Sequence, residues 1–586
     1  MANKEESEVN VNIEKYRRLV KHYIDLRLYS SALFWADKVV SLSSEDPEDI
    51  YWLAQCMYLL KQYHRAAELI MNRGLEKKHV LCYYLAARCF LEAYDLPEAL
   101  QVLNCGEQGS LLPNVSFLEG SPKEVQSAVL LLKGRVCEEM DNRALAVACY
   151  KEALCKDVHC YEAFEALTQH QMLPAWEGEE EVLSSLPLSE QCSGQEEERL
   201  VRTLYRTKLK KYHAPQQEPN ERLPAKLSSN LDVAVCEAER HYYNCNYREC
   251  LRITEQVLKK DSYHSGCFPV HIACLVDLKM SNKLFYLAHR LVDLYPESAV
   301  SWFAVGCYYY LIGKSDPARR YLAKATTLDK LFGPAWLAYG HSFATENEHD
   351  QAMAAYFKAS QLMKGCHLPL LYIGLENGLT NNVRLADKFL KQAAEIAEGD
   401  PFVLHEMGTI AYQNQDYAAA EQHFTAALER IKVVNGELIP SRWEPLYNNL
   451  GHTYRKLRKY EEALRMHQEA LLLSPMNAST YAAMAFVNAL LGNTSDAVDL
   501  FHKALGIRRD HTFSTTMLGY LLEQLMVETP PFSSSSETSA DSFLWQSTVP
   551  YLDIDRAALP SLHETSTSSL SFEVEMQDTS AVRILE

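Results

Sequence analysis

Small residues recur with a fixed period within stretches whose apolar positions follow helical spacing. The first series is rich in glycine and advances in steps of 34 residues, apart from one insertion of nine residues: Gly306, Gly340, Gly374, Gly408, Gly451, Ala485 and Gly519. A second series consists of alanines, 12 residues after each glycine position: Ala318, Ala352, Ala386, Ala420, Ala463 and Ala497. A third series starts at Ala325 and lies seven residues further on. Three phased series predict tandem copies of one unit.

The repeated glycine indicates that two helices approach each other closely. Glycine inside a helix costs about 1 kcal/mol relative to alanine, so its recurrence needs a reason. We expect a second helix to pack there, with the small residues 12 and 19 positions later on the opposite side of the contact. Large side chains, among them Trp336, Tyr356 and Phe424, fill the remaining space. This is the pattern of the 34-residue tetratricopeptide repeat (TPR), and it is nearly complete in WEPLYNNLGHTYRKLRKYEEALRMHQEALLLSP.

The predicted fold class is therefore all-α, a TPR helix-turn-helix solenoid that winds into a right-handed superhelix. The repeat is weaker in the N-terminal part, where Ala32 and Ala66 keep the period and Gly134 marks a further unit, and an insertion is expected at about 104–126. After about residue 526 the chain becomes rich in Ser and Thr and poor in core-forming residues. The predicted organisation has four parts: an N-terminal TPR array (1–173), a less regular helical linker (174–230), a C-terminal TPR superhelix (231–526) and a disordered tail (527–586).

Composition excludes several classes of function. The formal net charge of -19 and the pI of about 5.6 argue against a nucleic-acid-binding protein, which needs a basic face. The N-terminus, MANKEESEVN, does not resemble a signal peptide, and no stretch reaches the roughly 20 apolar residues of a membrane span. The chain has 16 cysteines but no CxxC pair, so we interpret Cys56, Cys89, Cys149 and Cys307 as small buried apolar residues of an intracellular protein.

Catalytic motifs are missing from the sequence. His405-Glu406 lacks the second histidine of HExxH because position 409 is Thr, and there is no P-loop, GxSxG or kinase signature. The segments outside the repeats are too short for a catalytic domain. We therefore expect a protein that is not an enzyme and has no cofactor, metal or small-molecule substrate.

Candidate binding residues lie beside the glycine positions. In a TPR array the first helices of successive units line the concave face, where extended peptides bind. Side chains there that combine hydrogen-bonding atoms with aromatic surface are candidates for a partner groove. They are His341, Asn377, His405, Tyr412, Asn448, Asn449, His452 and Arg455. The alternative is that these residues form only a solvated concave face.

Asn449, two residues before Gly451, raises a second functional hypothesis. It matches the asparagine with which clamp-type co-chaperone TPRs hold a C-terminal carboxylate. The other clamp positions hold His405, Thr409, Ser479 and Ala483 in place of Lys, Asn and basic residues. This counts against a co-chaperone or transport adaptor that binds C-terminal peptides, which stays the alternative function.

Two Ser/Thr-Pro dipeptides are candidate sites for proline-directed phosphorylation, at Thr529 in the tail and Ser121 in the insertion. A phosphate at Thr529 would add negative charge to an acidic segment.

Several stretches go beyond the general TPR pattern, including SALFWADKVVSL, PEDIYWLAQCMYLLKQYHRAA, SWFAVGCYYYLIG and GHSFATENEHDQAMAAYF. In these, over roughly 16–526, the chain resembles the cell-division-cycle sixteen subunits of the anaphase-promoting complex, a cell-cycle ubiquitin ligase. The resemblance implies a non-catalytic scaffold that acts in mitosis beside other TPR subunits. It also implies a homodimer formed by the N-terminal repeats, and a C-terminal superhelix that encloses the extended N-terminus of a small stabilising subunit. The implied location is the nucleus and cytoplasm, with the spindle or centrosome in mitosis.

Overall fold

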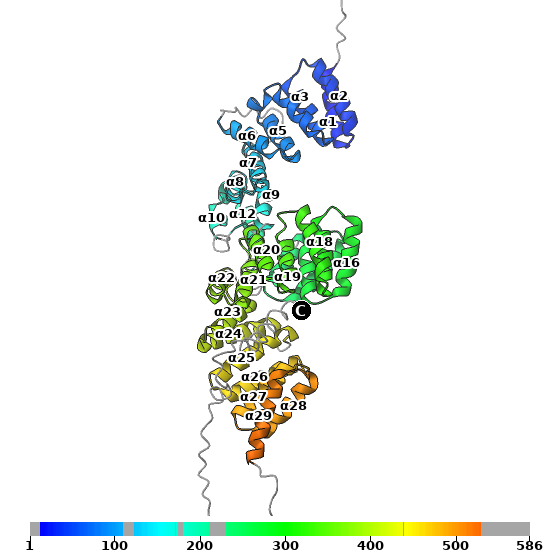
Figure 1. Cartoon of the computed structure of the whole chain (residues 1–586). Helices are drawn as coiled ribbons and strands as arrows, with labels where there is room; N and C mark the ends of the chain where they lie inside the picture. Colours follow the sequence, from blue (N-terminus) through cyan, green and yellow to red (C-terminus); the bar gives the residue numbers. More distant parts are fainter. Residues whose placement is uncertain are drawn as a thin grey trace, which may run out of the picture. The chain divides into compact units, whose positions relative to one another are not determined.

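The computed structural model describes residues 12–108, 122–169, 172–173, 180–209, 212, 227, 229–436 and 439–528. The regular structure of this part consists of α-helices and short 3₁₀ helices, which confirms the all-α TPR fold (Figure 1). Three predictions lie outside the described residues. They are the phosphorylation sites Ser121 and Thr529 and the disordered tail from residue 529 onward.

The chain divides into two compact units, residues 1–209 and 210–586. The first unit contains the helices α1 Ile13–Asp25, α2 Tyr29–Leu42, α3 Pro47–Leu59, α4 Tyr63–Met71, α5 Val80–Glu92, α6 Leu96–Gln108, α7 Pro122–Glu139, α8 Arg143–Lys156, α9 Tyr161–Gln169, α10 Glu180–Ser185, α11 Leu188–Gln191 and α12 Gln195–Leu209. Side chains of α10 to α12, within the predicted linker, share a core with α8 and α9, where the rings of Phe164 and Tyr205 stack at 4.0 Å. The predicted domain boundaries themselves stay predictions.

The second unit continues the helix pairs with the longer and more regular array. Its helices are α13 Leu231–Tyr243, α14 Tyr247–Lys260, α15 Phe268–Asp277, α16 Ser281–Leu294, α17 Ala299–Leu311, α18 Ser315–Leu328, α19 Gly333–Ala344, α20 His349–Leu362, α21 Leu368–Leu379, α22 Val383–Ile396, α23 Pro401–Gln413, α24 Tyr417–Asn435, α25 Glu444–Lys456, α26 Tyr460–Leu473, α27 Ala478–Leu490, α28 Thr494–Ile507 and α29 Thr512–Glu528. The inserted nine residues lengthen α24 to 19 residues and supply the segment before α25, which includes the 3₁₀ helix η4 Ser441–Trp443.

The repeated glycine marks the closest point between the two helices of a pair, as predicted, but its partner is a large side chain. A Cβ on Gly306 would lie 2.5 Å from Leu322, and one on Gly408 would lie 2.5 Å from the Phe424 ring. In both pairs the partner follows 16 residues later, and the same spacing joins Gly340 to Tyr356. The expected partners, 12 and 19 residues later, lie beside this contact: all six alanines of the 12-residue series are fully buried.

Gly519 departs from the predicted packing role. It lies in α29, and no described side chain comes within 4 Å of the position that its Cβ would occupy. The reason is that α29 is the first helix of a pair, and the described residues end before a second helix follows it.

The two helices of a pair are buried to different extents. The first helix α25 has ten buried residues, whereas its partner α26 has three: Ala463, His467 and Ala470. The pair α21 and α22 shows the same difference, with eight and three. A helix that is buried all round lies in the interior, whereas an amphipathic helix lies at the surface. The first helices therefore form the inner layer of the second unit.

The turn within each pair has its own 34-residue register. One residue of each turn adopts a left-handed backbone conformation, as at Cys245 (φ 61°), Lys279 (φ 55°), Gly313 (φ 70°) and Asn347 (φ 59°). In this region every residue except glycine pays a steric cost, because its Cβ crowds the backbone. The turns are thus repeated as faithfully as the helices, although only some carry glycine.

Candidate protein-binding groove

Two predicted groove residues, His405 on α23 and Asn449 on α25, contact each other. The Asn449 amide donates to Nε2 of His405 at 3.0 Å, and His405 Nδ1 then carries its proton and donates to Glu406 at 2.9 Å. This assignment of the tautomer follows from the amide being the donor. All three side chains are buried. The contact ties two successive first helices together through polar side chains.

A second polar cluster surrounds Glu444 at the start of α25. Its carboxylate accepts hydrogen bonds from Asn448, from Asn477 at 2.7 Å and from Thr480 at 3.2 Å. Asn448 also donates to the Thr480 hydroxyl at 2.8 Å and accepts from Nδ1 of His467 at 2.9 Å. Several hydrogen-bond donors compensate for the cost of burying the Glu444 carboxylate. Because these bonds come from α25 to α27, the cluster fixes α25 against α26 and α27.

The other predicted groove residues lie in separate surroundings. His341 bonds the Tyr356 hydroxyl through Nδ1 at 2.7 Å and meets the Tyr372 ring edge-on, with 4.3 Å between ring centroids. Asn377 donates to the Ile373 carbonyl of its own helix at 2.8 Å, and Tyr412 packs edge-on against Tyr417.

His452 and Arg455 lie further along α25 and are also buried. The ring of His452 is 5.0 Å from that of His467, and the guanidinium of Arg455 stands 5.1 Å from the centre of the Phe486 ring. Burial lowers the pKa of His467 to about 3, with a smaller contribution from Arg455. Burial likewise lowers the pKa of His341 to about 3 and that of His452 well below its usual range. These imidazoles are neutral near pH 7 and act as hydrogen-bonding and packing groups.

The arrangement bears on the carboxylate clamp. The amide of Asn449 is 3% exposed and donates to His405, so it is already engaged where a clamp would need it to hold a peptide carboxylate. Besides the charged Glu406, Glu444 and Arg455, the inner layer offers amide, hydroxyl and imidazole groups, and these suit the polar backbone of an extended peptide.

Sequence reasoning missed the acceptor at the centre of this layer. Glu444, His467, Asn477 and Thr480 complete the cluster around Asn448, yet none was predicted. The spacing of Glu444 and Asn448, four residues apart on one helix, was the one local signal. The contacts from Asn477 and Thr480 come from the next repeat and leave no mark in the sequence.

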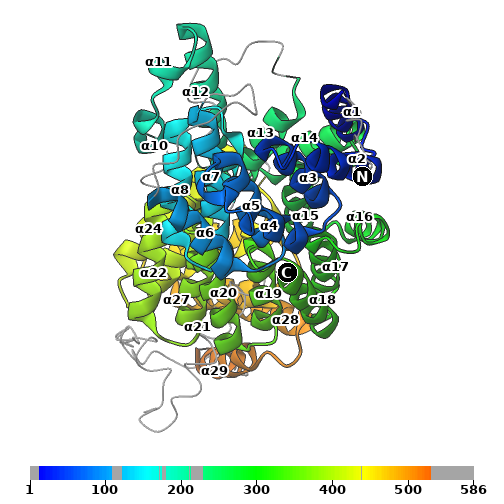
Figure 2. The same ribbon diagram turned by 90° about the horizontal axis from the view of Figure 1, so that it is seen from above.

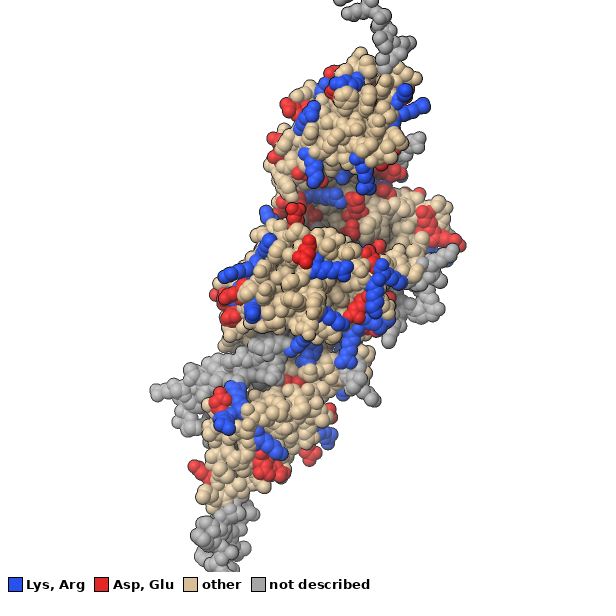
Figure 3. All heavy atoms as spheres, turned by 90° about the vertical axis from the view of Figure 1, so that its right-hand side faces the viewer, with Lys and Arg blue, Asp and Glu red and all other residues tan. Residues whose placement is uncertain are grey.

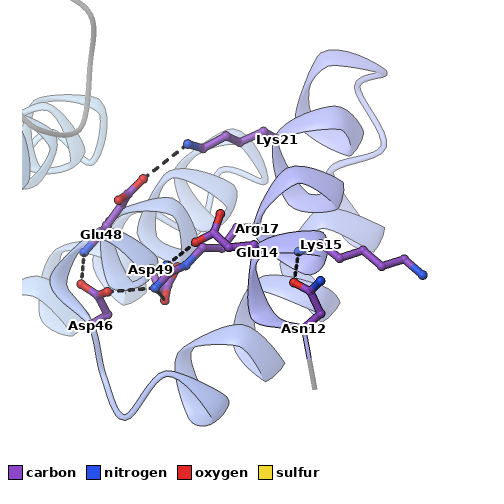
Figure 4. A network of polar contacts seen from close by, with 8 residues as sticks. All are labelled: Asn12, Glu14, Lys15, Arg17, Lys21, Asp46, Glu48 and Asp49. Atoms are coloured by element: carbon purple, nitrogen blue, oxygen red, sulfur yellow. Dashed lines mark hydrogen bonds and ion pairs between the residues drawn. The ribbon is translucent and has the colours of Figure 1, made fainter. Parts of the chain in front are cut away.

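The first unit carries a polar network between α1 and α3 (Figure 4). Arg17 donates to both carboxylate oxygens of Asp49, at 2.9 and 2.8 Å, and also to Asp46 and Glu14. Asp49 is 2% exposed, and Asp46 accepts from the Glu48 amide at the start of α3. This network holds α1 against the N-terminal end of α3.

Large apolar side chains are also exposed in the first unit. They belong to α2 and to the turn that precedes it: Leu26 (53%), Leu28 (50%), Phe34 (57%) and Leu42 (47%). An apolar surface of this kind at one end of an array is a candidate for a protein contact.

Within the described residues, no cluster of His, Cys, Asp or Glu fits a metal ion, and no helix is both long and apolar enough to cross a membrane. Cys56, Cys89, Cys149 and Cys307 are buried free thiols, as expected for small core residues. On the face shown in Figure 3, basic and acidic side chains are interspersed rather than gathered into one basic stripe.

Comparison with known proteins supplies the functional context. A family model described as anaphase-promoting complex, cyclosome, subunit 3 matches residues 25–105, and the tetratricopeptide repeat model matches residues 445–477. The cell division cycle protein 16 homolog of Homo sapiens is 54% identical over 88% of this chain and 84% of its own length. Anaphase-promoting complex subunit 6 of Arabidopsis thaliana is 38% identical over 87% of this chain and 96% of its own.

A solved structure shows the same fold over most of the chain. It is the crystal structure of the APC/C hetero-tetramer Cut9-Hcn1, which matches with a TM-score of 0.75 and 32% identity over 87% of this chain and 96% of that one. None of these relatives is named for a catalytic activity. The chain belongs to the Cdc16/Cut9 family of tetratricopeptide-repeat subunits of the anaphase-promoting complex.

Proposed function

We propose that this chain is a structural subunit of a cell-cycle ubiquitin ligase that forms a homodimer and encloses the extended N-terminus of a small partner subunit. The observation that carries the proposal is the match to Cut9, a chain solved together with a second protein, Hcn1. A hetero-tetramer of two kinds of chain holds at least two copies of one of them, which is consistent with self-association. The same proposal places the chain in the nucleus and cytoplasm, and at the spindle or centrosome in mitosis.

The first unit offers the dimerisation surface. Leu28 and Phe34 are half exposed or more, and the network of Arg17 and Asp49 ties α1 to α3, the two helices against which α2 packs. Two copies that bury these side chains against each other would remove apolar surface from water, which stabilises association.

Sedimentation of the full chain over a micromolar concentration series tests the dimer. The parent chain is expected to sediment as a dimer, and Phe34→Asp as a monomer. Val433→Asp is the matched control, because Val433 is 82% exposed on α24 of the second unit. A parent chain that stays monomeric at micromolar concentration would remove this part of the proposal.

The inner layer of the second unit offers the binding groove. Its first helices carry Asn448, His341 and neighbouring hydrogen-bonding groups, and these two side chains are only partly buried. A peptide held there would satisfy its backbone through amides and hydroxyls.

Binding of labelled Hcn1 to the purified chain, measured by fluorescence anisotropy, tests the groove. Asn448→Ala is expected to weaken binding roughly tenfold, because it breaks the cluster around Glu444 that fixes α25 against α26 and α27 and so changes the shape of the groove. Asn347→Ala, at an exposed turn, serves as the control. Equal affinities of the two variants would place the binding site outside the inner layer.

A further inference from the structure

The turn between α13 and α14 is buried, unlike the corresponding turns of later repeats. Lys279, Asn347 and Asn381, which hold the same position in their turns, are exposed, whereas Cys245 is 9% exposed. The Cys245 thiol points at the carboxylate of Asp400, with 3.8 Å between Sγ and Oδ2. These two residues are separated by 155 positions in the sequence. The first repeat of the second unit therefore meets a repeat five units further along.

A second contact joins the same parts of the unit. Arg442 in η4 donates to the backbone carbonyl of Asp277 at 3.0 Å and to its carboxylate at 3.2 Å, across 165 positions. The guanidinium also stands over the Tyr247 ring at 4.9 Å and over the Phe402 ring at 5.7 Å. Planar guanidinium groups favour this combination of ion pairing and stacking.

Asp400 lies at the start of α23, the helix that carries the predicted groove residues His405 and Tyr412. Its carboxylate caps α23 by accepting from the Phe402 amide at 2.8 Å, and it lies 3.3 Å from Nε2 of His367. Burial raises the pKa of the Cys245 thiol, so that this residue remains a donor. Burial also raises the pKa of Asp277, and Arg442 opposes this increase. The four residues Cys245, Asp277, Asp400 and Arg442 are named the clasp below.

The clasp differs from the other contacts in the unit. Adjacent helices pack through close backbone approach at Gly and Ala. Among the described elements, α13 to α15 make extensive backbone contacts only with one another, with the 3₁₀ helix η3 Ser265–Cys267, and with α16 and α17. Side chains carry the clasp, and apolar packing accompanies its polar contacts, since Cys245 and Tyr247 share a core with Phe402 and Trp443. Seen from above in Figure 2, α16 to α24 follow an arc, so a contact between α13–α15 and α23–η4 closes that arc. The clasp can therefore open without separating any helix pair.

We propose that the clasp is a gate of the groove: closed, it joins the first and later repeats of the second unit into a continuous wall, and open, it admits or releases an extended segment of another protein. The identity of that segment rests on the proposed function, whereas the gate itself does not.

Hydrogen exchange of the full chain, read by mass spectrometry, tests the gate without any partner. In Arg442→Gln, amides of residues 240–250 and 272–280 are expected to exchange roughly tenfold faster than in the parent. Lys459→Gln is the control, because it removes a 2.6 Å ion pair with Glu421 at the outer surface and is expected to act only locally. Asp277→Asn should reproduce the effect, and the double variant should add little. Unchanged exchange at 240–250 and 272–280 in both Arg442→Gln and Asp277→Asn would overturn the proposal.

Release of Hcn1, the probe of the proposed function, tests what the gate controls. Its dissociation is expected to be roughly tenfold faster from Arg442→Gln than from Lys459→Gln, and its association is expected to be faster as well. If Hcn1 binds and leaves both variants at the same rate, the clasp is not a gate. If Hcn1 binds none of the chains, the proposed function fails, and hydrogen exchange alone decides whether the clasp opens.

Discussion

The imidazole of His467 lies directly against Gly451, where a Cβ on the glycine would stand 2.6 Å from Cε1 of the ring. In other repeats the same position is occupied by Leu322, Tyr356 or Phe424, so one geometry accommodates a branched, an aromatic and a titratable side chain. What the repeat requires is the missing side chain on the first helix rather than a particular residue on the second.

Gly451→Ala is therefore expected to destabilise the second unit by about 2 kcal/mol, the typical cost of overpacking a close-packed site. The gain in helix propensity offsets only part of this cost. Urea unfolding followed by circular dichroism measures the difference.

Gly519→Ala is the matched control for this substitution. No described atom lies within 4 Å of the position that the new methyl group would take, so only the helix propensity changes. We expect a gain of about 0.5–1 kcal/mol. If Gly451→Ala and Gly519→Ala changed the free energy of unfolding by similar amounts, close helix packing would not be the reason for the glycine at this position.

His467→Phe is expected to reduce the sensitivity of the second unit to acid. With a folded pKa of about 3, His467 is neutral in the fold, whereas the unfolded chain takes up a proton below about pH 6.5. The stability that depends on the neutral form is complete above about pH 6.5 and is lost as pH falls towards 3. At about pH 5 this one group costs about 2 kcal/mol. Phenylalanine occupies the equivalent position at Phe424 and does not titrate.

The measurement is the slope of the unfolding free energy against pH between about 7.5 and 5. The absolute stability is not a clean readout, because His467→Phe also removes the hydrogen bond that His467 donates to Asn448. His502→Gln removes an exposed histidine from α28 and is expected to leave that slope as in the parent. An unchanged slope in His467→Phe would contradict the assignment of His467 as a buried neutral group.

The periodic features of this fold could be predicted from the sequence. Gly306 and Ala318 mark the helix pair because each repeat meets only its neighbours, so local spacing determines which residues touch. The prediction of the glycine's partner was wrong. We expected small residues 12 and 19 positions later, but the side chain opposite Gly306 is the large Leu322, 16 positions later. That distance depends on the length of the turn, which small-residue series do not reveal.

The non-periodic contacts could not be predicted. Cys245 and Asp400, or Asp277 and Arg442, meet because the superhelix brings distant repeats together, and no spacing rule spans five repeats. The groove shows the same limit. Position beside the glycine predicted that His405 and Asn449 lie on the inner layer, but not that they would bond each other.

Lys279→Gly is expected to stabilise the second unit by about 0.5–1 kcal/mol, because Lys279 adopts a left-handed conformation that disfavours a Cβ. Gly313 already occupies the same register one repeat later. Thermal unfolding measures the gain. Lys279→Ala removes the same long side chain but keeps the Cβ, so it should bring no gain, and an equal gain in both would refute backbone strain as the cause.

Arg17→Met is expected to destabilise the first unit by roughly 3 kcal/mol, because it leaves the Asp49 carboxylate buried without its bidentate partner. Lys21→Met provides the matched comparison, since Lys21 also reaches from α1 to α3 and pairs with Glu48 at 3.3 Å. That pair is exposed to water, so its loss should cost less than about 0.5 kcal/mol.

Limited proteolysis and urea unfolding would separate the two variants. Since α2 and the turn before it carry the proposed dimer surface, and α2 packs against α1 and α3, Arg17→Met should also weaken self-association, whereas Lys21→Met should not. Equal stabilities would mean that the Asp49 carboxylate finds other donors when Arg17 is lost.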